Sequence, residues 1–199
     1  MAESAEKTYE RVQTLARFRA QLACQKFVHV PDTWLDQALE SFNAYVPNSA
    51  INVNHLYKKW LNTDLRKIPF QHSPYPQISG QWGQISQIQG PMVMQVFSIK
   101  DVSKPDIQDQ DEDALLDVEK EQEGRQSQPT HQSQKNRSLS FKLFDGKREH
   151  RALEYLHLKG FKEEECTAGC KLLLKGNMEV SSGIILLKPG NWELLGGKS

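Results

Sequence analysis

The sequence predicts an α+β fold: an N-terminal three-helix bundle, then a small five-stranded β-barrel with a long insertion between its first two strands. Three observations predict it. Apolar residues recur at helical spacing through residues 8–68, and alternating strand patterns occupy residues 91–197. An acidic and glutamine-rich stretch, residues 103–137, interrupts the strand patterns. At 199 residues the chain is long enough to bury the cores that such a fold needs.

Three amphipathic segments make up residues 8–68. The second segment follows Pro31 and the third begins near Asn54, and the short joints between them favour a compact bundle. Trp34 and Trp60 are expected in its core, where large aromatic side chains usually lie. The other apolar positions at helical spacing are Val12, Leu15, Ala16, Leu22, Ala23, Phe27, Val30, Leu35, Ala38, Leu39, Phe42, Leu56, Leu61, Leu65 and Ile68.

Residues 69–90 contain three prolines and three glycines, which predicts a linker with one short extended piece. A first strand follows, in which either Met92, Met94 and Val96 or the opposite register with Val93 and Phe97 faces the core. We leave both registers open at this point.

The second strand is Ser138–Phe144, and the Asp145-Gly146 pair predicts a tight turn into a third strand that ends near Leu156. The core-facing residues of the second strand are Leu139, Phe141 and Leu143. Two apolar runs near the end, KLLLKG and GIILLKP, predict a hairpin of the fourth and fifth strands. Five short strands with a break after the third match the strand order of an OB-fold barrel.

The insertion, residues 103–137, has an acidic front half and a polar back half. Such a composition cannot bury enough apolar surface to fold alone. It contains one apolar island, Ala114 to Val118, within the acidic half. Two interpretations remain: a solvated segment without function, or a segment that becomes ordered on a partner and is anchored there by the island.

Several motifs carry a resemblance to a known family. They are VHVPDTWL and KKWLNTDLRKI in the helical part, and MQVFSIKDVSKP, FDG, ALEY, AGCKLLLKGN and GIILLKPGNWELLGG in the barrel. In this order and spacing the chain resembles the N-terminal half of the RecQ-mediated genome instability protein 1 family. A paralogous family, the Tudor-domain partners of topoisomerase III beta, shares the LNTDLR and hairpin motifs and is the second choice.

The resemblance implies a non-enzymatic, nuclear scaffold protein that binds topoisomerase III and works with a RecQ-type helicase. The barrel is expected to dock on the topoisomerase, and the insertion to enter its gate. This would favour decatenation and dissolution of double Holliday junctions in DNA repair, homologous recombination and replication. The residues expected to contact the partner are Pro105, Ile107, Leu115, Leu116, Val118, Lys171 and Lys175.

The chain departs from the family pattern in three places. It ends at Ser199, whereas family members continue into a second OB-fold. Ala168-Gly169-Cys170 stands where the family has Pro-Gly-Thr, with Lys171 kept. The insertion matches the family only in position and length.

The chain carries 25 basic and 25 acidic residues, a balance that argues against binding DNA mainly through phosphates. A basic cluster around the second and third strands remains a possible nucleic-acid site. Its members are Lys142, Lys147, Arg148 and Arg151. The alternatives are a solvated hairpin tip and, together with Lys171 and Lys175, a surface that faces acidic groups of a partner. A single-stranded nucleic-acid-binding OB-fold is therefore the second function considered.

No motif for phosphate binding, nucleophilic catalysis or zinc-dependent hydrolysis occurs, so we expect no enzyme activity and no cofactor. The three cysteines are Cys24, Cys166 and Cys170. A small and uneven number of cysteines suggests reduced thiols and an intracellular protein. Cys166 and Cys170 near His150 or His157 match zinc-site spacing only weakly. We expect no secretory signal and no membrane span.

Overall fold

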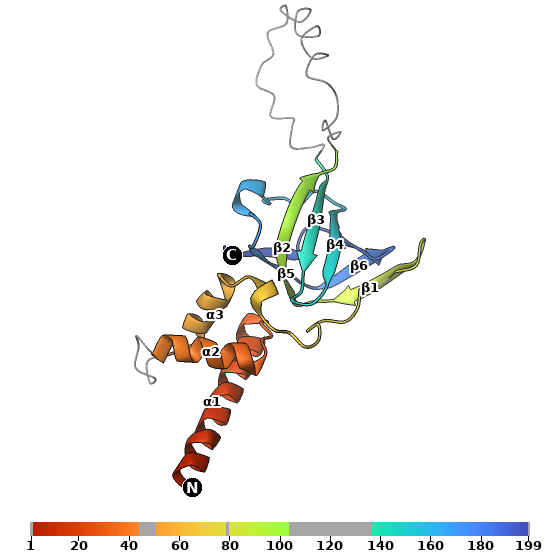
Figure 1. The fold of residues 1–199 in the computed structure, drawn as a ribbon. Helices are drawn as coiled ribbons and strands as arrows, with labels where there is room; N and C mark the ends of the chain where they lie inside the picture. The colour runs from red at the N-terminus through yellow and green to blue at the C-terminus, as the bar shows by residue number, and fades with distance from the viewer. Residues whose placement is uncertain (1, 44–50, 79, 104–136, 199) are drawn as a thin grey trace, which may run out of the picture.

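The computed structural model describes residues 2–43, 51–78, 80–103 and 137–198, with the helices gathered against one side of a β-sheet (Figure 1). The described part is thus an α+β structure with three α-helices and one sheet.

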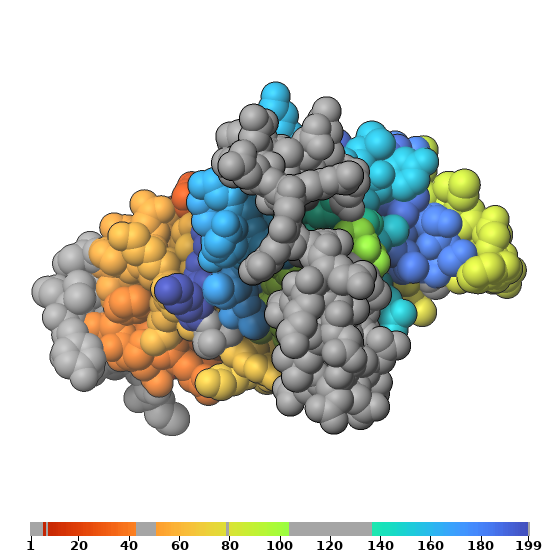
Figure 2. Space-filling model, turned by 90° about the horizontal axis from the view of Figure 1, so that it is seen from above, coloured from red at the N-terminus to blue at the C-terminus, as the bar shows by residue number. Residues whose placement is uncertain are grey.

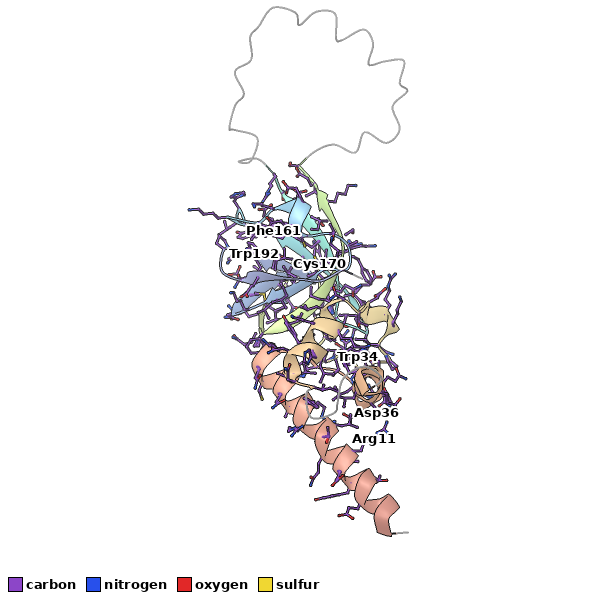
Figure 3. The ribbon with its side chains drawn as sticks, turned by 90° about the vertical axis from the view of Figure 1, so that its left-hand side faces the viewer. Arg11, Trp34, Asp36, Phe161, Cys170 and Trp192 are labelled. Carbon is purple, nitrogen blue, oxygen red and sulfur yellow. The ribbon has the colours of Figure 1, made fainter. Side chains whose placement is uncertain are left out.

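The three α-helices are α1 (Ala2–Lys26), α2 (Asp32–Asn43) and α3 (Val53–Leu61), and a 3-10 turn, η2 (Leu65–Lys67), follows them. Asn52 caps α3, because its side chain accepts hydrogen bonds from the first amides of that helix. α1 extends well beyond the other two helices (Figure 1). Figure 3 shows Arg11 of α1 directed toward Asp36 of α2, and the two form an ion pair at 2.6 Å.

Three residues expected in the helical core lie outside it, and Ala16 of α1 is one of them, since its side chain is exposed. Val12 is 57% exposed, because the adjacent Arg11 is the residue directed toward α2 and successive helical residues point about 100° apart. Phe27 is 40% exposed and has a φ of 56°, because it follows the last residue of α1 in the left-handed conformation that ends many helices. The amides of Phe27 and Val28 bond back to the carbonyls of Ala23 and Leu22 there.

The helices and the sheet share a hydrophobic core. Trp34 and Trp60 are buried in it, as predicted. Val93 and Leu173, which lie in the sheet, belong to the same cluster as the helical residues. The helices therefore pack directly on the sheet.

Eight strands form the sheet, in the order β1-β6-β7-β4-β3-β2-β5-β8. Their bounds are β1 Ile85–Gln89, β2 Met92–Asp101, β3 Leu139–Phe144, β4 Glu149–Glu154, β5 Lys171–Leu174, β6 Asn177–Ser181, β7 Ile184–Leu187 and β8 Trp192–Gly196. β4 and β7 are parallel, and the other pairs are antiparallel.

The predicted five-stranded barrel and its last hairpin need correction. Within the described residues the sheet has eight strands, and no pairing joins its edge strands β1 and β8. The predicted fourth strand pairs with β2 and β8 rather than with the GIILLKP strand. The chain leaves β5 at Lys175 and Gly176, where Gly176 has a φ of 73°, and continues as β6. β6 then makes the hairpin with β7 through Ser182 and Gly183.

The linker also joins the sheet, because its extended piece is β1, which pairs with β6.

The second core lies inside the sheet, where the predicted alternation of β3 is confirmed. Both registers considered for β2 apply at once: Met92, Met94 and Val96 face this core, while Val93 faces the helices. Phe161 and Trp192 close the core, with ring centroids 5.1 Å apart (Figure 3).

Candidate functional site

The two ends of the predicted insertion meet at a hydrogen-bonded base. The amide of Val102 donates to the carbonyl of Ser138 at 2.8 Å. The Oδ1 atom of Asp101 accepts from the amides of Ser103 and Ser138, both at 3.1 Å. Asp101 therefore fixes the chain on both sides of the insertion.

Arg137 anchors the second end in a different way. Its side chain is mostly buried, and Nη2 donates to the carbonyl of Phe161 at 2.9 Å. Its Nε atom lies 3.6 Å from the buried carboxylate of Glu154, and the guanidinium stands over the Phe161 ring. Glu154 in turn accepts from the amides of Leu139 and Leu158. Arg137 lies in none of the sequence motifs, although its partner Glu154 belongs to ALEY, and the anchor was missed.

The predicted partner contacts within the insertion lie outside the described residues. They are Pro105, Ile107, Leu115, Leu116 and Val118.

Lys171 is not a surface residue, which corrects the expectation that it faces a partner. It is fully buried, and Nζ donates to the carbonyls of Thr63 and Gly169 and to Oε1 of Gln95, at 2.9 to 3.0 Å. Its ammonium also stands 5.8 Å from the centre of the Trp60 ring. Burial lowers the pKa of Lys171 to about 8, against a favourable charge interaction with Asp64.

The same network explains the WLNTDLR motif. Gln95 Oε1 accepts from the amide of Leu65, and Gln95 Nε2 donates to Asp64. Arg66 forms a bidentate pair with Asp64, and these hydrogen bonds hold the pKa of Asp64 well below its usual range despite partial burial. The motif therefore joins the helical part to β2 and β5.

The terminal LLGG motif meets the same segment. The amide of Lys198 donates to Oδ1 of Asn62 at 3.2 Å. A Cβ added at Gly197 would lie 2.2 Å from the carbonyl oxygen of Leu61, so only glycine fits there. The KKWLNTDLRKI and GIILLKPGNWELLGG motifs thus contact each other in space.

Lys175, the other lysine expected to face a partner, is partly exposed. It forms an ion pair with Glu193 of β8 at 2.9 Å.

The structure divides the predicted basic cluster. Lys142 of β3 and Arg151 of β4 are directly paired across the sheet, and both are exposed. Lys147 and Arg148 lie in the turn after β3, where their amides donate to Oδ1 of Asp145 at 2.7 Å. Within the described side chains, Arg148 Nη1 is buried without a hydrogen-bond partner.

Two aromatic residues lie beside Lys142 that sequence reasoning did not combine with it. Phe97 and Phe144 are stacked with centroids 5.0 Å apart, and the guanidinium of Arg66 stands 5.3 Å from the centre of the Phe97 ring. A bulge in β2 between Val96 and Ser98 places Phe97 there. A hollow of about 380 Å³ opens at this point, lined by Arg66, Gln95, Val96, Phe97, Ser98, Lys142, Ala168 and Gly169.

Asp145 is the centre of a buried polar cluster. It accepts from Ser73 Oγ and is hydrogen-bonded to Nε2 of His150 at 2.9 Å. Burial alone would raise its pKa, but the bonds from His150, Ser73 and the turn amides lower it to about 2. Serine and histidine both bond the carboxylate and not each other, so the cluster lacks the order of a catalytic triad.

The sulfur atoms of Cys166 and Cys170 lie 2.9 Å apart in the sheet core, and Figure 3 shows Cys170 inside the sheet. The hydrogen bond between them and their burial raise the pKa of Cys166. Among the residues that the structure describes, no three histidine, cysteine, aspartate or glutamate side chains are grouped as a metal site. Within those same residues, no helix has the length and apolar character to cross a membrane.

Comparison with known proteins identifies the chain's relatives. A family model described as "RMI1, N-terminal OB-fold domain" matches residues 71–199. Proteins named RecQ-mediated genome instability protein 1 match from Xenopus laevis (29% identical over 178 residues, 86% of this chain and 31% of the relative) and Danio rerio (28% over 188 residues, 90% and 35%). The Gallus gallus protein of that name is 27% identical over 191 residues, covering 92% of this chain and 30% of the relative.

The chain thus spans about a third of the length of these curated relatives. The family model covers well over half of the chain, and the resemblance seen in its motifs is confirmed. The chain belongs to the RMI1 family and contains that family's N-terminal OB-fold domain.

Proposed function

We propose that this protein is a non-catalytic, nuclear scaffold and regulator of a complex between topoisomerase III and a RecQ-type helicase. Membership in the RMI1 family supports a role in genome maintenance with a RecQ-associated complex, since the relatives are named RecQ-mediated genome instability protein 1. These relatives are about three times as long as this chain, so the proposal concerns the part that the two share.

The observation that carries the proposal is the base of the insertion. Asp101 accepts from the amide of Ser138 and Arg137 donates to the carbonyl of Phe161, so both ends of the insertion are attached to the described part of the molecule. A segment with no capacity to form its own core is thus attached to a firm support, which suits a segment that acts on a partner.

In this proposal the OB-fold domain docks on the topoisomerase and residues 103–137 enter its gate. The apolar island around Leu115, Leu116 and Val118 is the anchor, with Pro105 and Ile107 near the base and Lys175 on the docking surface. The inserted segment favours strand passage in the direction of decatenation and of double Holliday junction dissolution.

The test compares the intact chain with a variant in which residues 106–134 are replaced by a short Gly/Ser linker. Pull-down of purified topoisomerase III and a kinetoplast DNA decatenation assay are the two measurements. We expect the variant to retain its thermal unfolding midpoint, bind the topoisomerase less tightly and stimulate decatenation less.

A matched control, Leu115→Asp with Leu116→Asp, keeps the length of the insertion and removes only the apolar island. Equal decatenation by the intact chain and both variants would show that the insertion does not act on the gate.

A second function, binding of single-stranded nucleic acid, is favoured by one observation. Lys142 and Arg151 lie on the same sheet as the stacked Phe97 and Phe144, beside Arg66 and the hollow of about 380 Å³. Aromatic platforms next to cations are the usual means by which OB-folds hold unpaired bases. The neutral net charge implies that such binding is weak.

Fluorescence anisotropy with a labelled dT20 oligonucleotide at low salt tests this second function. Phe97→Ala should weaken binding several-fold, and Lys142→Glu should also reduce its salt dependence. Lys147→Glu, in the turn, is the matched control and should bind like the unmodified chain. No binding at low salt would exclude the function.

A further inference from the structure

Within the described part of the chain, no strand pairs with the outer edge of β1. Gln84 accepts from the amide of Ser182 and the amide of Gly90 donates to Gly176, so these two residues face β6. Antiparallel strands alternate, so Ser86 and Ile88 also bond β6. The amides and carbonyls of Ile85, Gln87 and Gln89 therefore point to the other side, where the described part of the chain provides no strand.

This edge lacks the features that normally prevent a strand from pairing further. β1 contains no charged residue and no proline, and its pairing with β6 has no bulge. The opposite edge strand, β8, carries Glu193, Gly196 with a φ of 81°, and a register shift against β5. One edge of the sheet is thus protected and the other is open.

The chain around β1 is also free of charge over an unusual length. Residues 68–99 contain no Asp, Glu, Lys or Arg, although a quarter of the whole chain is charged. When two copies of this uncharged edge approach each other, no like charges face each other and repel.

The edge is accessible. Trp82 is 96% exposed and Ile85 is 71% exposed. Figures 1 and 2 place β1, drawn in yellow-green, at the outermost side of the molecule, away from the helices. The turn before β1 is held by the amide of Gly83, which donates to Oγ of Ser182.

We propose that β1 pairs with β1 of a second copy of this chain, antiparallel and about a two-fold axis through Gln87. The outward residues Ile85, Gln87 and Gln89 are centred on Gln87, so this axis places Gln87 opposite Gln87 and Ile85 opposite Gln89 of the second copy. Each of these pairs exchanges two N–H···O=C bonds, so every outward group finds a partner. The side chain of Gln87 does not obstruct the edge, because it accepts from Asn177 of β6.

The contact is small, since a stable dimer needs at least about 1,000 Å² of buried surface and a five-residue edge supplies less. The pairing is therefore weak and concentration-dependent, and a covalent trap is the appropriate probe.

The trap is Gln87→Cys in a chain that also carries Cys24→Ser, which removes the exposed native thiol. Directly opposed residues of a hydrogen-bonded pair have Cα atoms about 5.5 Å apart, within the range of a disulfide. Oxidised glutathione supplies the oxidant: two thiols lose two electrons and two protons, and the glutathione disulfide is reduced to two thiols. We expect a disulfide-linked dimer on non-reducing gels.

The matched control is Gln89→Cys in the same background, which faces Ile85 of the second copy and not its own equivalent. It should crosslink at least tenfold more slowly than the Gln87→Cys chain. Equal rates for the two variants, or no dimer from either, would overturn the proposal.

Gln87→Pro gives an independent measurement, because it removes an outward amide and leaves the backbone bonds of Ser86 and Ile88 to β6 in place, although it also loses the side-chain bond from Asn177. In sedimentation velocity at increasing concentration, the unmodified chain should shift toward a dimer and Gln87→Pro should stay monomeric with an unchanged circular dichroism spectrum. An unmodified chain that stays monomeric up to millimolar concentration would refute self-pairing and leave this edge to a strand of another protein.

Discussion

The buried side chain of Lys171 joins three separate segments of the chain. Its ammonium donates to Thr63, Gln95 and Gly169, which come from the helical part, from β2 and from the loop before β5. Gln95 and Gly169 are buried and Thr63 is partly buried, so removal of the donor leaves buried polar groups without a partner, which costs the full desolvation penalty of those groups.

We predict that Lys171→Met lowers the free energy of unfolding by about 2–4 kcal/mol, because a buried set of acceptors loses its charged donor. Urea unfolding followed by circular dichroism measures it. Lys175→Met, at the exposed pair with Glu193, is the matched control and should change stability by less than about 0.5 kcal/mol. Similar losses of stability in both variants would contradict the inference that Lys171 stabilises the fold as a buried hydrogen-bond donor.

Lys171 also predicts a pH dependence. Its pKa is about 8 in the folded chain and 10.5 when unperturbed, so between these values the unfolded chain holds a proton that the folded chain has released. The stability of the unmodified chain, measured relative to Lys171→Met, should therefore rise with pH from about 8 to about 10.5. A flat difference across this window would mean that the ammonium is not desolvated.

Asp145 predicts a loss of folding stability at acidic pH. Its folded pKa of about 2 lies below the ordinary 3.8, so its contribution is present above pH 4 and is lost as pH falls toward 2. Asp145→Asn should be less stable at pH 7 by about 1–3 kcal/mol and should lose less stability on acidification. Thermal unfolding at pH 7, 4 and 2.5 tests both statements.

At the scale of elements, the end of the chain is fitted to the end of α3. Gly197 has a φ of 93° and lies against the Leu61 carbonyl, while Gly196 has a φ of 81° and open space around its Cβ position. An alanine at Gly196 therefore tests backbone strain alone, whereas an alanine at Gly197 adds a steric clash to the same strain.

Gly196→Ala should cost about 1–2 kcal/mol, which is the strain of a left-handed alanine. Gly197→Ala should cost more, because the same strain is joined by a clash with backbone that cannot move aside. Chemical denaturation of both variants gives the comparison. If the two losses were equal, the contact with α3 would contribute nothing.

Local patterns in the sequence predicted most helices and strands correctly, but they did not predict which strands pair with one another. The alternation in β3 and the helical spacing around Trp34 and Trp60 follow from which side of one segment is buried. The bend between β5 and β6 and the inclusion of β1 in the sheet depend on distant segments, so no local period reveals them. β2 was ambiguous because the core covers one of its faces and the helices cover the other.

The site was predictable to a smaller extent for the same reason. The sequence indicated the insertion from its composition, but not the Arg137 anchor, which depends on Glu154 and the Phe161 carbonyl. It placed Lys171 on the surface because lysines usually lie there, and only the tertiary network accounts for its burial. Phe97 and Phe144 are 47 positions apart in the chain, and the pairing of β2 with β3 brings them together.

At the scale of the whole molecule, helices and sheet share buried residues, so we expect them to unfold together. Leu173 of β5 is buried among the helical residues, so it belongs to both parts. The Lys171 network joins them a second time.

Leu173→Ala should therefore destabilise both parts together, by about 2–4 kcal/mol. Native-state hydrogen exchange should show amides of α2 and β3 accelerating by the same factor. Acceleration confined to the helices would show that the two parts unfold separately.

The base of the insertion has a consequence for how this protein changes over evolutionary time. Asp101 and Arg137 attach the two ends of the insertion to the described part of the molecule, and doubling the length of a closed loop costs only about 0.6 kcal/mol. Selection for folding thus leaves that stretch free to drift, to lengthen or to be exchanged. If the proposed function holds, a lineage can change its partner contact there while the framework stays the same, and a foreign peptide could be displayed at the same place.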